Sequence, residues 1–259
     1  MYTIDANETH GRLMSFTTPT GYKYTIREQN GEDDDILSNL GDSANLFNIS
    51  KFVAGLVVET DYTSSHKVTA QQVHTMPSLD RYCILIMSRI FSISKEMDFY
   101  VDWGNGRKVE YTQDLEELVF DYEKQPSEED LLSRKDAIPY YPYGKQVKDI
   151  TIQTTSGKSL LFDLMTPESE AYLVNLPIDQ RTKNQELVAR NLRLKVGDHF
   201  EKVQNFRAFS VKDMMEIRRA VSAADPIYGG DVEVEDPMTK EVRTVNLFSL
   251  GNFFYPEEI

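Results

Sequence analysis

The segment 77–112 constrains the fold of this chain more than any other stretch. In this segment the pattern of an unusually apolar helix is followed directly by the pattern of a β-hairpin. Leu79, Cys83, Ile86 and Ile90 recur at helical spacing on one face. Further apolar residues extend this surface most of the way round, so the helix is expected to be buried. In the hairpin that follows, apolar residues alternate on both sides of a Gly-Asn-Gly turn. The segment holds no nucleophile beside a base, no metal cluster and no phosphate loop, and it predicts a structural core.

The composition indicates a globular protein that binds neither nucleic acid nor membrane. The chain has 259 residues, 40% of them hydrophobic, and a formal net charge of −14. Binding to a phosphate backbone needs clustered Lys and Arg, which this charge argues against. No window approaches the roughly 18 apolar residues of a membrane span. No secretory signal is recognised at the N-terminus, so the chain is expected to be made and used in a cytoplasm.

Cys83 is the only cysteine, so an internal disulfide and a cysteine-based zinc cluster are excluded. Because Cys83 falls on the apolar face of the expected helix, we interpret it as a small buried hydrophobe rather than a reactive thiol.

Hairpin and helix patterns alternate along the rest of the chain. The turn sequence Thr18-Pro19-Thr20-Gly21 predicts a hairpin over 13–28, and the acidic run 32–35 is interpreted as a helix start rather than a metal site. Further helices are expected over 43–58, after Thr166 through Leu176, over 184–196 and over 211–224, with Thr166 and Ser210 as the N-caps of the second and the last of these. Further hairpins are expected around 154–157 and 236–239.

This alternation predicts an α+β fold of short antiparallel β-hairpins and helices in two lobes. The three prolines and the polar run of residues 123–146 indicate a connector. The expected domains are an N-terminal lobe at 1–122, this connector, and a C-terminal lobe at 147–259. The stretches FTTPTGYKYTIREQNGEDDDIL and ITIQTTSGKSLLFDLMTPESEAYL share one order of elements, which indicates a repeated hairpin–helix module.

Two aromatic clusters are candidates for partner binding. Tyr140, Tyr141 and Tyr143 in the connector could cover the core or form an exposed contact patch, since Tyr is enriched at protein interfaces. The C-terminal cluster contains Phe253, Phe254 and Tyr255. Leaving such surface in water costs about 25 cal/mol per Å², so this tail either packs on its own domain or docks into a partner.

The residue types that carry catalysis form no recognisable motif. The four histidines are far apart, and Ser64-Ser65-His66 is better interpreted as a polar loop than as a nucleophile beside its base. The glycine pairs lack the surroundings of a dinucleotide or phosphate loop. A pair of carboxylates of the glycosidase type stays open without geometry. We therefore predict no catalytic residue, no cofactor and no metal.

Several segments together carry a family resemblance. They are FTTPTGYKYTIRE, SLDRYCILIMSRIFSISKEMDFYVDWGNGRKVEYTQDL, ITIQTTSGKSLLFDLMTPESEAYL, VKDMMEIRRAV and NFFYP. Their order resembles the baseplate hub and tail-assembly proteins of contractile-tailed, T-even-like phages. Members resemble this chain in a helix with an Asp near its start and Arg-x-x-Ser near its end, here Asp80 and Arg89-Ile90-Phe91-Ser92. Many carry Cys-x-x-Cys at the next hairpin, a pattern that the resemblance associates with zinc. Residues 102–106 have no cysteine, so a metal there is not carried over.

The resemblance implies a non-enzymatic structural or assembly component of a phage tail baseplate. Its partners would be hub, tube or tape-measure proteins, in a symmetric hetero-oligomeric assembly within the virion. Removing residues 252–259 would then be expected to abolish assembly and to leave the monomer folded. Two alternatives stay open: a transient tail-assembly chaperone that is absent from the finished particle, and a hydrolase that uses carboxylates or His66.

Overall fold

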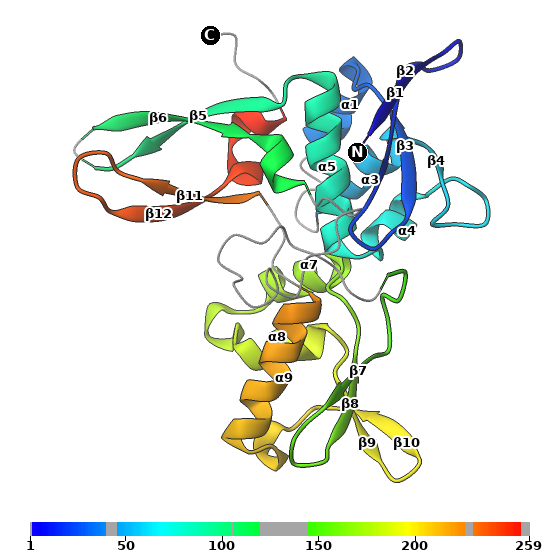
Figure 1. Cartoon of the computed structure of the whole chain (residues 1–259), viewed down its shortest axis with the longest axis vertical. Coiled ribbons are helices and arrows are strands. Elements are labelled where there is room, and N and C mark those ends of the chain that lie inside the picture. Colours follow the sequence, from blue (N-terminus) through cyan, green and yellow to red (C-terminus); the bar gives the residue numbers. More distant parts are fainter. Residues whose placement is uncertain (1, 40–45, 105, 120–143, 226–229, 255–259) are drawn as a thin grey trace, which may run out of the picture.

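The computed structural model describes residues 2–39, 46–104, 106–119, 144–225 and 230–254, and it has the α+β architecture that the sequence predicts (Figure 1). Two four-stranded antiparallel sheets lie in separate lobes, and two further hairpins lie beside the first lobe.

The first lobe is built on an antiparallel sheet whose strand order is β1 (Thr3–Asn7), β2 (Gly11–Thr17), β3 (Lys23–Arg27) and β4 (Val57–Thr60). Alternate residues of the central strands are buried, namely Met14, Phe16, Tyr24 and Ile26. The described part of this lobe also contains the helices α1 (Gly31–Leu37), α3 (Phe47–Leu56) and α4 (Ala70–His74). The acidic run opens α1, as predicted, with Asp33 paired to Arg27 at 2.8 Å.

Helix α5 (Ser78–Ser92) is the buried helix that the sequence predicts, and it carries the core of the first lobe. Cys83 is buried on it, and burial raises the pKa of its thiol. Asp80 is fully buried and accepts hydrogen bonds from the Thr20 N–H, at 3.1 Å, and from the Thr20 hydroxyl. This carboxylate ties the turn between β2 and β3 to the first turn of α5. Burial raises the pKa of Asp80 to about 7.

The C-terminal segment covers another side of α5 through two short 3-10 turns, η4 (Leu247–Ser249) and η5 (Gly251–Phe253). The ring of Phe248 stacks on Tyr82 with centroids 5.2 Å apart. Arg89 donates a hydrogen bond to the carbonyl of Phe253 at 2.7 Å, and its guanidinium lies 5.5 Å from the centre of the Phe253 ring. Such guanidinium–aromatic contacts and charged hydrogen bonds stabilise a buried arginine. Both ends of α5 are thus anchored to segments far away in the sequence.

The second lobe repeats the plan of a sheet with helices on it (Figure 1). Its strand order is β10 (His199–Lys202), β9 (Arg193–Val196), β8 (Ser159–Phe162) and β7 (Ile150–Gln153). Its helical elements are α7 (Pro167–Asn175), η2 (Ile178–Gln180), α8 (Lys183–Ala189), η3 (Phe206–Ala208) and α9 (Val211–Ala224). Thr166 caps α7 and Ser210 caps α9, as predicted.

The two lobes share the hairpin turn that the sequence repeat indicates. The N–H of Gly21 donates to Thr18 at 2.8 Å, and the N–H of Gly157 donates to Thr154 at 3.0 Å. Both glycines have φ +85°, a conformation that favours glycine.

An aspartate of a helix binds each turn. Asp80 binds the first, and Asp213 of α9 accepts hydrogen bonds from Ser156 and, at 2.8 Å, from Lys158 of the second. The Lys158 ammonium and the Ser156 hydroxyl hold the pKa of Asp213 below its ordinary value. The repeated module therefore consists of a hairpin, its turn and a helix bound to that turn.

The expected domain boundaries are wrong at the C-terminal end. Residues 231–254 were expected in the lobe 147–259, but β11 (Asp231–Glu235), β12 (Val242–Asn246) and the tail pack against the first lobe instead. The reason is that the aromatic tail finds its apolar contacts on α5. The described part of the second lobe is therefore 144–225. Of the expected connector at 123–146, residues 123–143 lie outside the described residues.

Two expected helices are shorter in the structure than in the sequence pattern. The helix expected over 184–196 ends at Ala189, Asn191 has the left-handed φ of +52°, and a strand begins at Arg193. The helix expected over 43–58 ends at Leu56, and its last two residues start β4. Short apolar runs fit both periods, and sheet pairing decided these cases. Strand β1 was not predicted, because all its residues are exposed.

The two lobes meet at Glu170 of α7. Its carboxylate accepts a hydrogen bond from Arg81 at 2.9 Å and from the Tyr82 hydroxyl at 3.1 Å. Arg81 is buried, and its Nε and Nη1 have no hydrogen-bond partner in the described part of the chain. Because a buried charge without its partner is costly, this contact couples the lobes.

Candidate interaction surface

Two hairpins lie side by side and form a projection, which we call the arm (Figure 1). It consists of β5 (Glu96–Asp102) with β6 (Lys108–Asp114), and of β11 with β12; the 3-10 turn η1 (Leu115–Leu118) follows β6. Every second residue of β5 and β11 is buried, namely Met97, Phe99, Val101, Val232 and Val234. Because a strand alternates its side chains between two faces, the arm has an apolar inner side and a polar outer side.

Polar contacts between the hairpins hold the arm together. Arg107 donates two hydrogen bonds to Asp236, one of them at 2.7 Å, and this guanidinium holds the pKa of Asp236 below its ordinary value. The Tyr111 hydroxyl accepts from the indole N–H of Trp103 at 3.0 Å and donates to the carbonyl of Glu235 at 3.0 Å. The guanidinium of Arg243 lies 4.5 Å from the Trp103 ring centre. Contacts among the protein's own residues therefore hold the hairpin of β5 and β6 in place.

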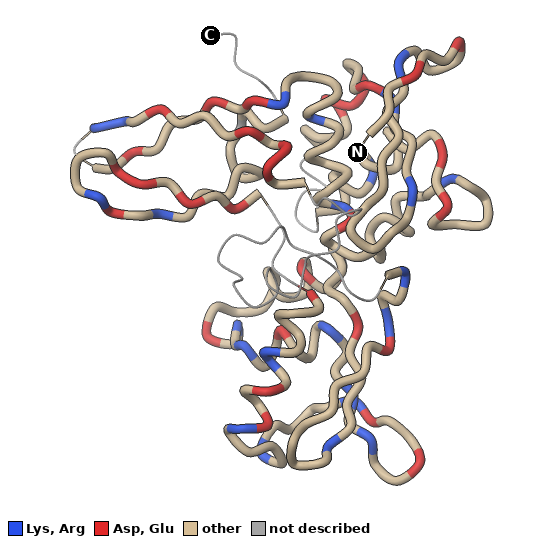
Figure 2. The backbone as a smooth tube through the Cα atoms, in the orientation of Figure 1, with Lys and Arg blue, Asp and Glu red and all other residues tan. Residues whose placement is uncertain are grey.

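Acidic residues are frequent along the arm, as the red segments of Figure 2 show. The strands β5, β6, β11 and β12 contain eight carboxylates against Lys108 and Arg243. On β5 and β11 the acidic residues are the exposed ones of the alternation: Glu96, Asp98, Asp102, Asp231, Glu233 and Glu235. Like charges so close together repel one another, and an approaching basic surface would relieve this repulsion.

Tyr100 adds apolar surface to this acidic face. Its side chain is 61% exposed, and its hydroxyl donates to Glu110 at 2.9 Å across the hairpin. Tyrosines held in this way present a large contact area that loses little side-chain entropy on binding. Sequence reasoning missed this residue. The signal was present, because Tyr100 lies between Phe99 and Val101 in the alternation and must therefore face the opposite side of the strand.

The aromatic residues predicted to bind a partner are placed differently. Phe253 is 1% exposed and contacts the rings of Phe248 and Phe254, so its side chain is buried by residues of the same chain. Phe254 is partly buried and packs edge to face on Phe52, with ring centroids 6.0 Å apart. Of the two alternatives for this tail, the structure shows packing on the same chain, and docking through Phe253 is wrong. The expectation that the monomer stays folded without residues 252–259 stays a prediction, and the burial of Phe253 argues that this truncation also removes core contacts of the first lobe.

The other four aromatic residues, Tyr140, Tyr141, Tyr143 and Tyr255, lie outside the described residues.

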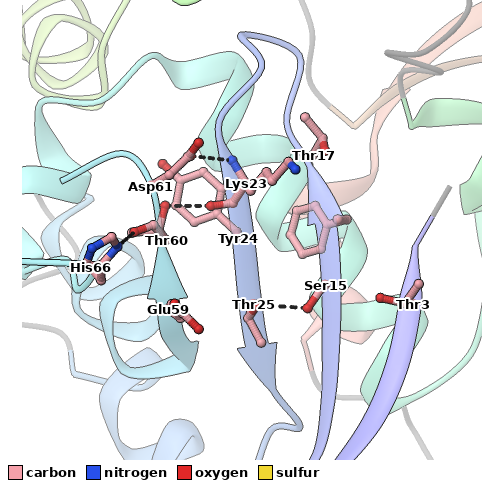
Figure 3. Close-up of a pocket in the computed structure, with 11 residues that line it drawn as sticks. Thr3, Ser15, Thr17, Lys23, Tyr24, Thr25, Glu59, Thr60, Asp61 and His66 are labelled. Atoms are coloured by element: carbon pink, nitrogen blue, oxygen red, sulfur yellow. Dashed lines mark hydrogen bonds between the residues drawn. The ribbon is translucent and has the colours of Figure 1, made fainter. Parts of the chain in front are cut away.

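A groove of about 430 Å³ lies along the sheet of the first lobe (Figure 3). Hydroxyl groups line it, with Ser15 and Thr25 hydrogen-bonded at 2.8 Å. It also contains Glu59, Asp61 and His66, the residue types that a hydrolase would use.

The geometry of these residues does not favour catalysis. Asp61 accepts from the Lys23 N–H at 2.7 Å and from Lys145 at 2.6 Å. His66 contacts the carbonyl of Thr60 through Nδ1. Figure 3 shows Glu59, Asp61 and His66 pointing to separate sides of the end of β4. A general acid–base pair needs both groups within reach of one reacting atom, which this arrangement does not provide.

The Ser64-Ser65-His66 stretch is a polar loop, as predicted. The hydroxyl of Ser65 donates to the carbonyl of Lys67 at 3.0 Å, while His66 binds the carbonyl of Thr60. Within the described part of the chain, no group of three or more His, Cys, Asp and Glu residues is placed to hold a metal ion. None of the helices described is both long and apolar enough to span a membrane.

Comparisons with known proteins give no relative. No family model, no curated protein and no solved structure matches the chain.

Proposed function

We propose that this chain is a non-enzymatic structural or assembly component of a phage tail baseplate, of the hub type, and that it contacts a neighbouring tail protein through the arm. The resemblance in sequence supports the phage assignment. Its Asp80 and its Arg89 both have a structural role, since one anchors a hairpin turn and the other anchors the C-terminal segment. Residues of this kind suit a rigid part of an assembly.

The arm is the observation that carries the proposal. Its inner side is closed by its own apolar residues, so the outer side is what it offers to a partner. That side combines carboxylates with the exposed Tyr100. The partner surface that fits it is basic, with an apolar position opposite the tyrosine.

The test is mass spectrometry of purified virions of the phage that encodes the chain. The arm variant carries Glu96→Lys and Glu233→Lys, two exposed carboxylates for which no side-chain contact is seen in the described part of the chain. The control variant carries Asp179→Lys and Asp198→Lys, which are exposed on the second lobe and change the charge by the same amount. We expect the wild type and the control in the particles and the arm variant to be missing, although it folds as the wild type does by circular dichroism.

Three other outcomes contradict the proposal or part of it. Incorporation of the arm variant would rule out the arm as the contact. Loss of both variants would mean that net charge, and not this surface, matters. A chain that is required for assembly but absent from finished particles would be a transient assembly chaperone.

A further inference from the structure

The helices α5 and α9 occupy equivalent places in the two repeated modules. Asp80 is the third residue of α5, and Asp213 is the third residue of α9. Each accepts a hydrogen bond from the hydroxyl at the third position of its turn, from Thr20 and from Ser156 respectively. The two helices can therefore be compared residue by residue, with the aspartates as the common origin.

The same face of both helices packs against the lobe. In α9 the buried positions are the aspartate and the residues one, four, eight and eleven places further on, and all of these are buried in α5 as well. The residues are Asp213, Met214, Ile217, Val221 and Ala224 in α9, and Asp80, Arg81, Ile84, Ser88 and Phe91 in α5. This agreement confirms the register of the comparison.

Within the described residues the opposite faces differ, because a segment of the chain covers this face of α5 and none covers that of α9. The cover of α5 is the segment 247–254, which stacks Phe248 on Tyr82 and binds Arg89 through the ring and carbonyl of Phe253. The equivalent of Tyr82 in α9 is Met215, which is 66% exposed. One turn before it lies Val211, which is 80% exposed, and one turn after it lies the exposed Arg219.

We propose that the face of α9 formed by Val211, Met215 and Arg219 is a docking surface for an aromatic segment of a partner protein, which covers it as residues 247–254 cover α5. The three residues recur every four positions, so they form one stripe on the helix. A methionine thioether and a guanidinium both make favourable contacts with aromatic rings. At the position equivalent to Met215, Tyr82 of α5 takes the aromatic ring of Phe248, and this is the contact that the comparison carries over to α9.

This inference goes beyond the proposed function, because α9 lies in the second lobe, away from the arm (Figure 1). Either one can fail without the other.

The probe for this surface is a fluorescein-labelled peptide with the sequence of residues 247–254, LFSLGNFF, added to the full-length protein. We expect saturable binding by fluorescence anisotropy. The double variant Val211→Asp/Met215→Glu is expected to bind about ten-fold more weakly. The control variant Ile178→Asp replaces another apolar residue of the second lobe, 83% exposed, and is expected to bind as the wild type does. A peptide with its three phenylalanines changed to serine is expected not to bind.

A second measurement locates the peptide. In a spectrum of ¹³C-methyl-labelled methionines, the signal of Met215, assigned with a Met215→Leu variant, is expected to shift on addition of the peptide. Three results would each overturn the proposal: no saturable binding, equal binding by the wild type and the Val211→Asp/Met215→Glu variant, or binding without a shift at Met215.

Discussion

Two charged residues of α5 show how single side chains hold this molecule together. Asp80 is separated from Thr20 by about 60 positions in the sequence, and Arg89 from Phe253 by more than 160, yet each pair is in direct hydrogen-bond contact. Both charges are almost completely buried. Burying a charge is costly unless hydrogen bonds compensate it, so removing either partner is expected to destabilise the fold.

The buried Asp80 gives the protein a stability that depends on pH near neutrality. Its pKa is raised by burial to about 7 in the folded chain, whereas the ordinary value is 3.8. Between these values the folded state binds a proton that the unfolded state does not, so this contribution is complete below pH 3.8 and is lost as pH rises through 7. The slope is at most about 1.4 kcal/mol per pH unit.

The Asp80→Asn variant is expected to lose this slope. An asparagine can still accept the N–H of Thr20, but it does not titrate. Urea unfolding of the variant and the wild type at several values between pH 5 and pH 8 measures the difference. Asp213→Asn is the control, because the pKa of Asp213 is lowered and that group titrates below this window. Equal slopes in the wild type and Asp80→Asn would contradict the assignment.

At the scale of elements, Trp103 is expected to be the residue that contributes most to the stability of the arm. Its ring is 8% exposed, packs under Arg243 and donates to Tyr111. Trp103→Ala is expected to lower the free energy of unfolding by about 3–5 kcal/mol, as for other large buried aromatic residues. Urea unfolding followed by circular dichroism measures this.

Tyr100→Ala serves as the matched control on the same strand. Because this ring is 61% exposed, the change is expected to stay within about 0.5 kcal/mol. A chelator is expected to leave the unfolding of the wild type unchanged. If the Trp103→Ala variant were as stable as the wild type, or if a chelator loosened the hairpin, something other than this packing would hold the arm.

Local patterns predicted the hairpins and helices well where the chemistry is local. The Thr-x-x-Gly turns, the caps Thr166 and Ser210, and the apolar stripe of α5 all act within a few residues, so the sequence alone was sufficient. The end of α8 was missed because the chain turns at Asn191 to pair β9 with β8, and sheet pairing is not local. In β1 only Ile4 and Ala6 alternate with polar residues, and so short a pattern did not stand out from the sequence around it.

Among the contacts that join the two lobes is the one between Glu170 and the two residues Arg81 and Tyr82, beside the hydrogen bond from the Ser78 N–H to the Met165 carbonyl at 2.8 Å. Glu170→Ala leaves the buried Arg81 without its carboxylate and is expected to cost about 3–5 kcal/mol. Trp103 is the only tryptophan and lies in the arm, so its fluorescence reports on the part of the chain packed with the first lobe, while circular dichroism reports on both lobes. In the wild type the two urea transitions are expected to coincide, and in Glu170→Ala they are expected to separate.

The control for this prediction is Glu168→Ala, an exposed carboxylate on the same helix, for which the transitions are expected to coincide. Coincident transitions in Glu170→Ala as well would mean that the lobes are coupled through other contacts.

The candidate site was harder to predict than the fold because it depends on contacts between segments that are distant in the sequence. Aromatic density in the tail showed that these residues must be buried, but not against what. In the structure Phe253 packs against α5, whereas Tyr100, Val211 and Met215 stay exposed. Which apolar surface stays open depends on which distant segment covers the rest, and no local pattern contains that information.

The cover of α5 also fixes the order in which the chain can fold during synthesis. Phe253 is made about 160 residues after α5 ends, which at a translation rate of about 5–20 residues per second takes roughly 8–30 s. The sheet and helices of residues 144–225 are complete before that time. The lobe that is synthesised first can therefore complete its core only after Phe253 has been made, and until then Tyr82 and Arg89 of its central helix lack the contacts that the C-terminal segment supplies.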